Sequence, residues 1–236
     1  IRLYIIQWSN YILSRNRDKF SNTLENNIIF QDRTEYTFTS SNQSYTVPNS
    51  DTTLQLSNDI TISSWFKITT TYWGGTDPWT RIIGKGSQHV INYGLWIHDN
   101  DDNSDSFSLL LQIYGPNSEM AQCMNSNVKL DTNTWYNLTG VFDKGNKSFL
   151  YLDGVEIAST TDGNNISPLT STDELTIGSA ITYATYLRGG VKDITIYNTA
   201  LTSSQVSEVY NSYPESLTNK FNLQHYSVTS GASYSS

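Results

Sequence analysis

The chain has 236 residues, of which 37% are hydrophobic, 13% aromatic and 15% charged, and its net charge is -8. This length accommodates one large β-sandwich or two small domains, and we expect one main domain. The acidic balance excludes a protein that binds nucleic acid through a basic surface. There is no run of about 18 apolar residues, so we expect no membrane span. A single cysteine, Cys123, excludes an internal disulfide.

Three segments are expected along the chain. Residues 1–30 begin without methionine and are rich in aromatic residues, which favours an excerpt or a processed product. We expect them to form an N-terminal arm or a contact to a preceding domain or a neighbouring subunit; an edge of the sandwich itself is the alternative. Residues 31–213 are expected to form the main domain. Residues 214–236 end in a stretch rich in Ser and Gly, which predicts a C-terminal linker or tail.

Short runs of alternating or β-branched residues predict strands throughout the main domain. The run from Ile60 to Ile68 is among the clearest, because Ile60, Ile62, Phe66 and Ile68 share one face at a period of two. We expect this strand to be central. The predicted strands are residues 28–30, 35–39, 44–47, 60–68, 82–83, 94–98, 107–114, 135–142, 148–152, 155–158, 175–177 and 191–197.

The stretch WYNLTGVFDKGNKSFLYLDGVE from Trp135 predicts a three-stranded meander. A polar connection with a glycine joins residues 135–142 to residues 148–152, as in a β-hairpin. The pair Asp153-Gly154 then suits a type I′ turn into the third strand. In the first strand, even-numbered positions from Tyr136 to Phe142 fall on one face, which suits a sheet covered on one side by a second sheet.

Only one helix has a full signature. Thr202 suits the N-cap, Gln205 completes a capping box, and Val206, Val209 and Tyr210 form an apolar stripe. Many strands with a single late helix predict an all-β fold: a two-sheet antiparallel β-sandwich, or jelly roll, with one short C-terminal helix.

Four stretches carry a resemblance to a known family: ITISSWFKI from Ile60, IIGKG from Ile82, the meander from Trp135, and GGVKDITIYNTALTSSQVSEVYN from Gly189. From about Glu35 to Asn211 the chain resembles the laminin G-like jelly-roll family within the concanavalin A-like lectin and glucanase fold. The resemblance implies a secreted or cell-surface module that binds glycans or proteins in recognition or adhesion. It also implies that calcium is often bound.

A candidate calcium loop lies in the acidic turn of residues 99–105. Asp99, Asp101, Asn103 and Asp105 alternate along it, and calcium needs several hard oxygen donors that converge on one ion. The glycine and the closing glutamate of an EF-hand are missing, so an EF-hand is excluded. The alternative interpretation is a solvated hairpin tip.

The family resemblance implies a second metal candidate, Asp193. In some relatives a carboxylate in the strand before the final helix helps to hold a structural calcium or the helix itself. The early strands lack the acidic turn that usually accompanies it. A hydrogen bond or an ion pair with a nearby Lys or Arg is therefore the alternative interpretation.

The loop of residues 69–81 is the candidate ligand site. Aromatic rings stack on the C–H faces of sugars, and flanking polar groups bind the hydroxyls. The loop offers Tyr72, Trp73, Asp77, Trp79 and Arg81 for these roles. Alternatively, its tryptophans cover the edge of the sandwich or meet a neighbouring subunit.

An enzyme is not expected. Glucanases of this fold resemble one another in a Glu-x-Asp-x-x-Glu strand that places two glutamates on one face for retaining hydrolysis. This chain has no such stretch, and its three histidines form no zinc motif. Seven glutamates are isolated in sequence: Glu25, Glu35, Glu119, Glu156, Glu174, Glu208 and Glu215.

Asn-x-Ser/Thr patterns place accessible candidate glycosylation sites at Asn146 and Asn165. The function expected from the sequence is a non-catalytic extracellular module that binds glycans or glycoproteins at a cell or particle surface. The alternative is a structural subunit of a surface layer, a filament or a virion, in which the same sandwich makes contacts by self-association.

Overall fold

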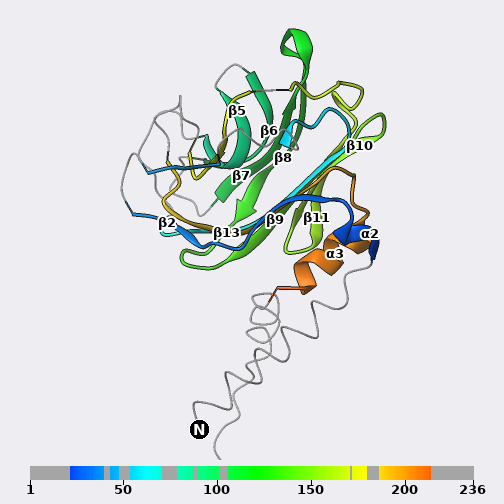
Figure 1. The fold of residues 1–236 in the computed structure, drawn as a ribbon. Coiled ribbons are helices and arrows are strands. Elements are labelled where there is room, and N and C mark those ends of the chain that lie inside the picture. Colours follow the sequence, from blue (N-terminus) through cyan, green and yellow to red (C-terminus); the bar gives the residue numbers. More distant parts are fainter. Residues whose placement is uncertain are drawn as a thin grey trace, which may run out of the picture.

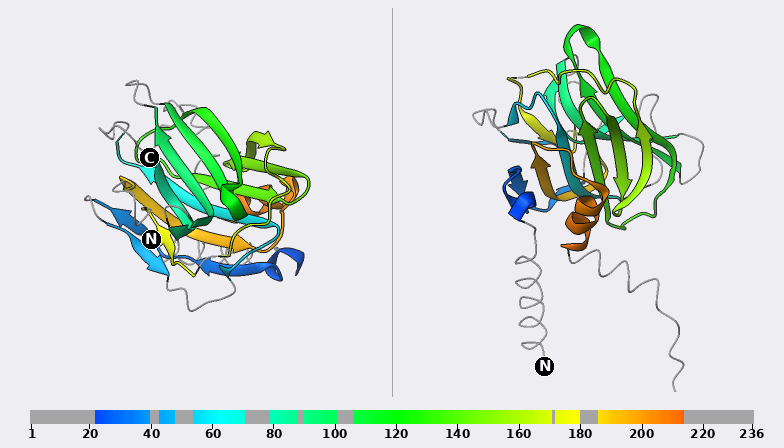
Figure 2. Two further views of the ribbon diagram at one scale, coloured as in Figure 1. Left: turned by 90° about the horizontal axis from the view of Figure 1, so that it is seen from above. Right: turned by 90° about the vertical axis from the view of Figure 1, so that its right-hand side faces the viewer.

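A computed structural model describes residues 22–39, 43–47, 54–70, 79–87, 90–100, 106–170, 172–179 and 186–213. Two antiparallel sheets stack face to face in these residues, with short helices at one end (Figure 1). Figure 2 shows the two layers from above and from the side. The prediction of an all-β jelly-roll sandwich is confirmed.

The first sheet has seven strands. Its order is β1-β13-β4-β9-β10-β11, and β2 pairs with β13 beside this path. Strand β4 lies between β13 and β9, so the prediction that residues 60–68 form a central strand is confirmed. The strands are β1 (Ile28–Asp32), β2 (Tyr36–Phe38), β4 (Ile60–Ile68), β9 (Tyr136–Asp143), β10 (Lys147–Leu152), β11 (Val155–Thr160) and β13 (Gly189–Tyr197).

The second sheet has six strands in the order β3-β12-β5-β6-β7-β8. Strand β8 is ten residues long and was not among the predicted strands. Its sequence, MAQCMNSNVK, contains one β-branched residue and many polar ones, which is weak evidence for a strand. The strands are β3 (Tyr45–Val47), β5 (Thr80–Ser87), β6 (Val90–Asp99), β7 (Ser106–Tyr114), β8 (Met120–Lys129) and β12 (Leu175–Ile177).

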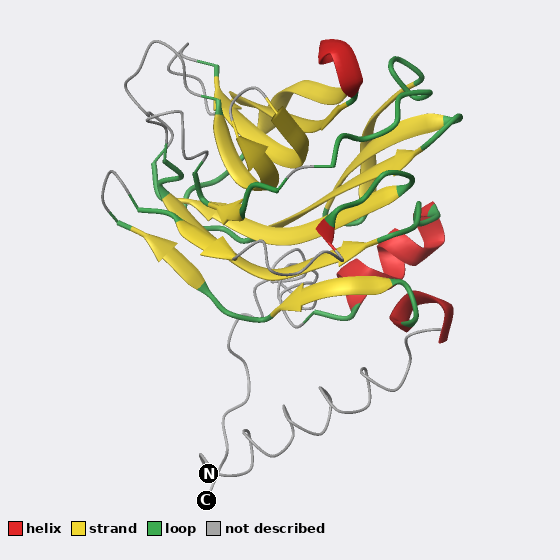
Figure 3. Cartoon of the chain, turned by 45° about the horizontal axis from the view of Figure 1, so that its top comes forward, coloured by secondary structure: helices red, strands yellow, loops and turns green. Residues whose placement is uncertain are grey.

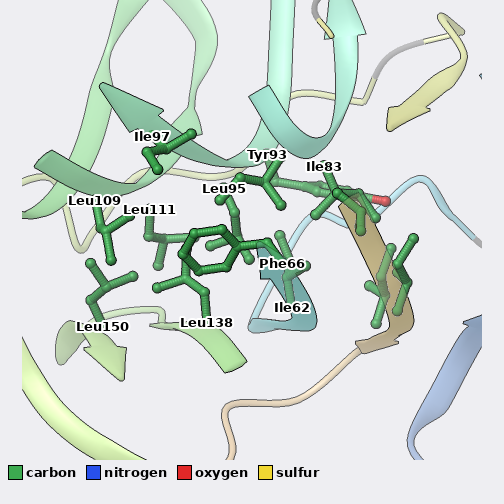
Figure 4. Close-up of a cluster of buried hydrophobic side chains, with 14 of the residues drawn as sticks. Ile62, Phe66, Ile83, Tyr93, Leu95, Ile97, Leu109, Leu111, Leu138 and Leu150 are labelled. Carbon is green, nitrogen blue, oxygen red and sulfur yellow. The ribbon is translucent and has the colours of Figure 1, made fainter. Parts of the chain in front are cut away.

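The inner faces of the two sheets share one hydrophobic core. Figure 4 shows Ile62 and Phe66 of the first sheet facing Leu95 and Leu111 of the second. The even-numbered face of β9 points into this core as predicted, since a side chain built on Gly140 would meet Leu95 and Leu111 at 2.8 Å. Burial in this core raises the pKa of the Cys123 thiol to about 12, which makes it a packing residue and not a reactive thiolate.

The hairpin between β10 and β11 has the predicted type I′ turn. Asp153 and Gly154 both have positive φ, 51° and 77°. The amide of Asn137 donates a hydrogen bond of 2.8 Å to the Asp153 carboxylate, which ties this turn to β9. The meander is thus held by its neighbouring strand as well as by its turns.

Helix α3 (Ser203–Asn211) covers the outer face of the seven-stranded sheet. Thr202 and Gln205 form the predicted capping box at its start. Its apolar stripe packs on Trp65 of β4, whose ring is stacked on Tyr210 with centroids 5.6 Å apart. The short helix α2 (Asn22–Glu25) lies near α3 in Figures 1 and 3, and Leu24 is buried in the same cluster. A short 3-10 helix, η2 (Pro116–Ser118), joins β7 to β8.

None of the helices in the described residues has the length and apolar character needed to cross a membrane. Residues 1–21 and 214–236 lie outside the described part of the chain. Strand β1 begins at Ile28 and pairs with β13, so the sandwich starts within the segment that the sequence suggested as an arm. The remainder of the expected division into three segments stays a prediction.

Candidate functional site

The outer face of the six-stranded sheet is unusually apolar. In β6, Tyr93, Leu95 and Ile97 point into the core between the sheets, so Trp96 lies on the opposite face. Trp96 pairs with Leu110 of β7, and both belong to a separate hydrophobic cluster. Ile91, Trp96 and Leu110 are only 3%, 3% and 5% exposed, so the cluster itself is covered, and its partly buried members Trp79 and Tyr114 bring aromatic rings to the surface beside it.

This cluster borders a groove of about 490 Å³, which we call the outer-face groove. Its size falls within the range of small-ligand sites, roughly 300–1,000 Å³. The lining combines three aromatic residues, three aliphatic or thioether side chains and two amides. The lining residues are Trp79, Ile91, Trp96, Leu110, Gln112, Tyr114, Gln122 and Met124.

A row of cross-strand partners forms the middle of this face. Gly84 of β5 pairs with Gly94 of β6, Gly94 with Gln112 of β7, and Gln112 with Gln122 of β8. A side chain on Gly94 would come within 3.0 Å of the indole nitrogen of Trp96. Gly94 therefore makes room for the Trp96 ring, and the two amides stand beside it on the adjoining strands.

Arg81 of β5 supports Trp96. Its guanidinium lies 4.8 Å from the centre of the Trp96 ring, and the side chain is 1% exposed. Its Nη1 donates hydrogen bonds to the Gly86 carbonyl at 2.8 Å and to the Thr176 hydroxyl at 2.9 Å. The cation is thus held against the sheet and the indole, a position that fixes the aromatic floor of the groove.

A polar network holds the end of the groove at Trp79. The rings of Trp79 and His98 have centroids 4.8 Å apart. His98 Nδ1 lies 3.2 Å from Oδ1 of Asn100, which also accepts a hydrogen bond from the Ser108 hydroxyl at 2.8 Å. Asn100 in turn donates to the Ser106 hydroxyl at 3.1 Å. This network orients the His98 imidazole, and the imidazole packs against one side of the half-buried Trp79.

The structure describes two of the five residues suggested for ligand binding. Trp79 lies in the groove, and Arg81 lies against Trp96 with almost no exposed surface. Tyr72, Trp73 and Asp77 lie outside the described residues. Their part in binding stays a prediction.

The candidate calcium loop is described only at its first residue. Asp99 ends β6 and is buried, while Asp101, Asn103 and Asp105 lie outside the described residues. Within the part of the chain that the structure describes, no three or more His, Cys, Asp or Glu side chains gather as a metal site would require. The calcium loop stays a prediction.

Asp193, the second metal candidate, lies in β13 of the other sheet. Its φ of 50° coincides with a shift in the pairing of β13 with β4, as at a β-bulge. The guanidinium of Arg33 donates to Asp193 Oδ1 at 3.3 Å and also stacks on Tyr213 at 4.8 Å. An ion pair of this kind is what the alternative interpretation predicts. It links the connection after β1 to β13 and to the segment after α3.

Both candidate glycosylation sites are exposed. Asn146 lies in the turn between β9 and β10 and donates to the Asp143 carboxylate at 2.8 Å. Asn165 lies in an exposed connection that follows β11. Their exposure is compatible with modification, which stays a prediction.

Sequence reasoning missed most of the groove. The signal for Leu110 and Trp96 was present, because the runs around them are apolar on both faces, and a strand with a solvated outer face alternates. Ile91 joins the groove because a bulge in β6 between Tyr93 and Ile91 interrupts the alternation. Gln122 belongs to the strand that was not predicted.

A laminin G family model, described as the concanavalin A-like lectin/glucanases superfamily, matches residues 39–207. The chain belongs to this family. The match covers most of the described sandwich and confirms the resemblance seen in the sequence. None of the curated proteins matches the chain.

Solved structures share the family's fold. The receptor binding domain of botulinum neurotoxin D is 14% identical, with a TM-score of 0.59, and the match covers 80% of this chain and 53% of that one. The binding domain of Paraclostridial Mosquitocidal Protein 1 matches with the same identity and coverage and a TM-score of 0.60. A serotype D domain in complex with N-acetylneuraminic acid is 16% identical, with a TM-score of 0.56 and coverage of 75% and 42%. The chain thus spans about half the length of these binding domains, and at this identity the likeness shows the fold alone.

Proposed function

We propose that the chain is a non-catalytic recognition module that binds glycans or glycoproteins, at an extracellular or surface-exposed location, through the outer-face groove. The observation that carries the proposal is the lining itself: aromatic rings and two glutamine amides gathered on the outer face of a rigid sheet. Aromatic rings cover the C–H faces of sugars, and amides donate to and accept from hydroxyls in one plane.

The comparisons support this choice of ligand class. Family membership places the chain among lectin-like folds, and one similar structure was solved with a bound sugar acid. The lectin-like fold is a property of the family, and the bound sugar acid belongs to that one protein. The outer-face groove is the feature of this chain that supports a similar ligand class.

A binding role without catalysis is supported by the chemistry of the lining. Glycoside hydrolysis by the usual route needs two carboxyl groups on either side of the scissile bond. Among the described lining residues, none carries a carboxyl group. The thiol of Cys123 lies in the core with a raised pKa, so it offers no nucleophile.

A glycan array tests the proposal. The chain is expected to bind a defined group of glycans, and Trp79→Ala is expected to weaken binding at least about tenfold, about 1.4 kcal/mol. Trp135→Ala is the matched control, because Trp135 is also half-buried but lies beside Lys67 and Lys192 of the seven-stranded sheet. Equal binding by the wild type and Trp79→Ala would contradict the proposal.

The second candidate function is a structural subunit that self-associates. It is favoured by exposed apolar side chains on the adjacent edge strands β8 and β11, namely Met120, Met124 and Val155. Sedimentation over a range of concentrations separates the two functions. Assembly without any glycan binding would favour the structural subunit, and a monomer that binds glycans would favour recognition.

Calcium remains part of the proposal through the acidic turn that contains Asp99. A cation that binds only the folded state must raise the melting temperature by mass action. We expect a higher melting temperature in calcium than in chelator, and the difference is expected to persist in Asp193→Asn if the turn is the site. Identical melting curves would remove calcium from the proposal.

A further inference from the structure

The outer-face groove is uncharged in its described lining. Of the residues that border it, none is a Lys, Arg, Asp, Glu or His in the part of the chain that the structure describes. Moving an anion from water into an apolar site costs free energy unless a cation or several hydrogen bonds compensate it. The groove therefore presents a surface suited to sugars that carry no acid group.

Arg81 and His98, which lie next to the described lining, are both held in place. Arg81 is almost fully buried, with its Nη1 hydrogen-bonded to Gly86 and Thr176. His98 is behind Trp79 and lies within hydrogen-bonding distance of Asn100. Arg81 has almost no exposed surface and does not line the groove, so its guanidinium offers no direct hydrogen bond to a sugar carboxylate there. The net charge of -8 adds an unfavourable long-range field for anions.

The groove is also long. Trp79 stands beside His98, and His98 pairs with Ser108 near the start of β7. Tyr114 stands at the other end of β7, close to Ile91. The rise of about 3.3 Å per residue separates Ser108 and Tyr114 by about 20 Å along the strand, which exceeds the width of one sugar ring.

The polar and apolar groups are spread along this length. Trp79 and Tyr114 mark the two ends, and Trp96 and Leu110 form the floor between them. Gln112 and Gln122 lie side by side on β7 and β8, where they can pair with hydroxyls along one edge of a ligand. Separate aromatic platforms at the ends with amides between them suit a chain of rings better than a single ring.

We propose that the outer-face groove binds an uncharged oligosaccharide that spans several sugar rings, with Trp79 and Tyr114 as stacking platforms of two separate subsites. This rests on the proposed function and names the ligand class of the same site. It distinguishes this groove from a site that reads one acidic terminal sugar.

Calorimetric titration with neutral oligosaccharides of increasing length tests the proposal, starting from the glycan type that the array identifies. Affinity is expected to rise at least about tenfold from one ring to the full span and then level off. The same oligosaccharides carrying a sialic acid or a sulfate group are expected to bind more weakly. Tightest binding to the acidic forms, or equal affinity for a single ring and a long chain, would overturn it.

Variants at the two ends locate the subsites. Trp79→Ala and Tyr114→Ala are each expected to lower affinity about tenfold for a spanning oligosaccharide. For a single ring, only one of the two substitutions is expected to matter. Trp79→Phe and Tyr114→Phe keep a stacking ring and are expected to retain most of the affinity, which separates loss of stacking from loss of folding. Loss with both variants at every length would count against separate subsites.

A charge variant tests the ligand class directly. Met120 of the edge strand β8 is exposed, pairs with Tyr114 and is not one of the lining residues, so Met120→Lys introduces a cation beside the groove with little effect on packing. It is expected to increase binding of the acidic oligosaccharide several-fold and leave the neutral one nearly unchanged; no gain would argue against an uncharged groove.

If no glycan of any kind binds, the proposed function fails with this inference, whereas tight binding of acidic glycans that Trp79→Ala weakens overturns the inference alone.

Discussion

The outer faces of the two sheets both carry a tryptophan on a central strand, but the surroundings of the two rings differ. On the seven-stranded sheet, Trp65 is covered by α3, with Tyr210 stacked on its ring and Tyr213 at its edge. On the six-stranded sheet, Trp96 forms the floor of a groove of about 490 Å³. An aromatic residue on a sheet surface therefore becomes part of a second core where the chain supplies a helix to cover it. Trp96 is also buried, at 3% exposed, but the half-buried Trp79 and Tyr114 beside it line a groove that is a candidate binding surface.

The largest effect is expected from a change under the helix. Trp65→Ala removes a fully buried indole between β4 and α3. The free energy of unfolding is expected to fall by about 3–5 kcal/mol, the range for Trp→Ala in a core. Urea denaturation measures this. Trp79→Ala, in the open groove, serves as the control and is expected to cost much less stability; equal losses would break the comparison.

A smaller loss of stability is expected when the side chain that supports Trp96 is replaced. Arg81→Met keeps most of the side-chain volume but leaves the Thr176 hydroxyl and the Gly86 carbonyl without their donor. The free energy of unfolding is expected to fall by about 1–3 kcal/mol. Glycan affinity is expected to fall as well because Trp96 loses its fixed position. A stable variant with unchanged affinity would show that the groove does not depend on this residue.

Loss of the capping box is expected to lower the free energy of unfolding by about the contribution of one hydrogen bond. Thr202→Ala removes the side chain that accepts from the Gln205 amide at 3.3 Å. A loss of about 1 kcal/mol in unfolding free energy is expected, measured by thermal or urea denaturation. Thr202→Ser keeps the hydroxyl and is expected to be nearly neutral. Glycan affinity is expected to be the same in both variants, since α3 covers the opposite sheet.

The smallest effect is expected at the turn next to α3. Burial raises the pKa of the Asp153 carboxyl above its ordinary value of 3.8, against a smaller lowering by the hydrogen bond from the Asn137 amide. The folded state then holds this proton more tightly than the unfolded state, so stability from this group falls as pH rises from 3.8 through the raised pKa. Asp153→Asn keeps the oxygen that accepts from Asn137 and tolerates positive φ.

The variant is therefore expected to be slightly more stable than the wild type at neutral pH, and the difference is expected to vanish below about pH 4, near the ordinary pKa of an aspartate. Melting temperatures of both proteins between pH 3 and pH 8 measure it. A difference that grows toward low pH would reverse the sign of the expected coupling.

The two faces also differ in how far the sequence predicted them. The capping box at Thr202, the apolar stripe of α3 and the period-two face of β4 are local patterns, and each was confirmed. The groove depends on pairing between β6, β7 and β8. Its residues are far apart in sequence, and one of the strands, β8, has too few β-branched residues to be recognised. Of the predicted ligand site, Trp79 lines the groove and Arg81 packs against Trp96, while Tyr72, Trp73 and Asp77 lie outside the described residues.

Helices α2 and α3 bring both ends of the described fold to one side of the molecule, where Leu24 shares a cluster with Val206 and Val209. The groove belongs to the other sheet. A tether attached at either end would thus leave from the back of the module and leave the groove unobstructed. Several such modules mounted on one scaffold would all point outward at once, and weak individual contacts would then add up to firm attachment.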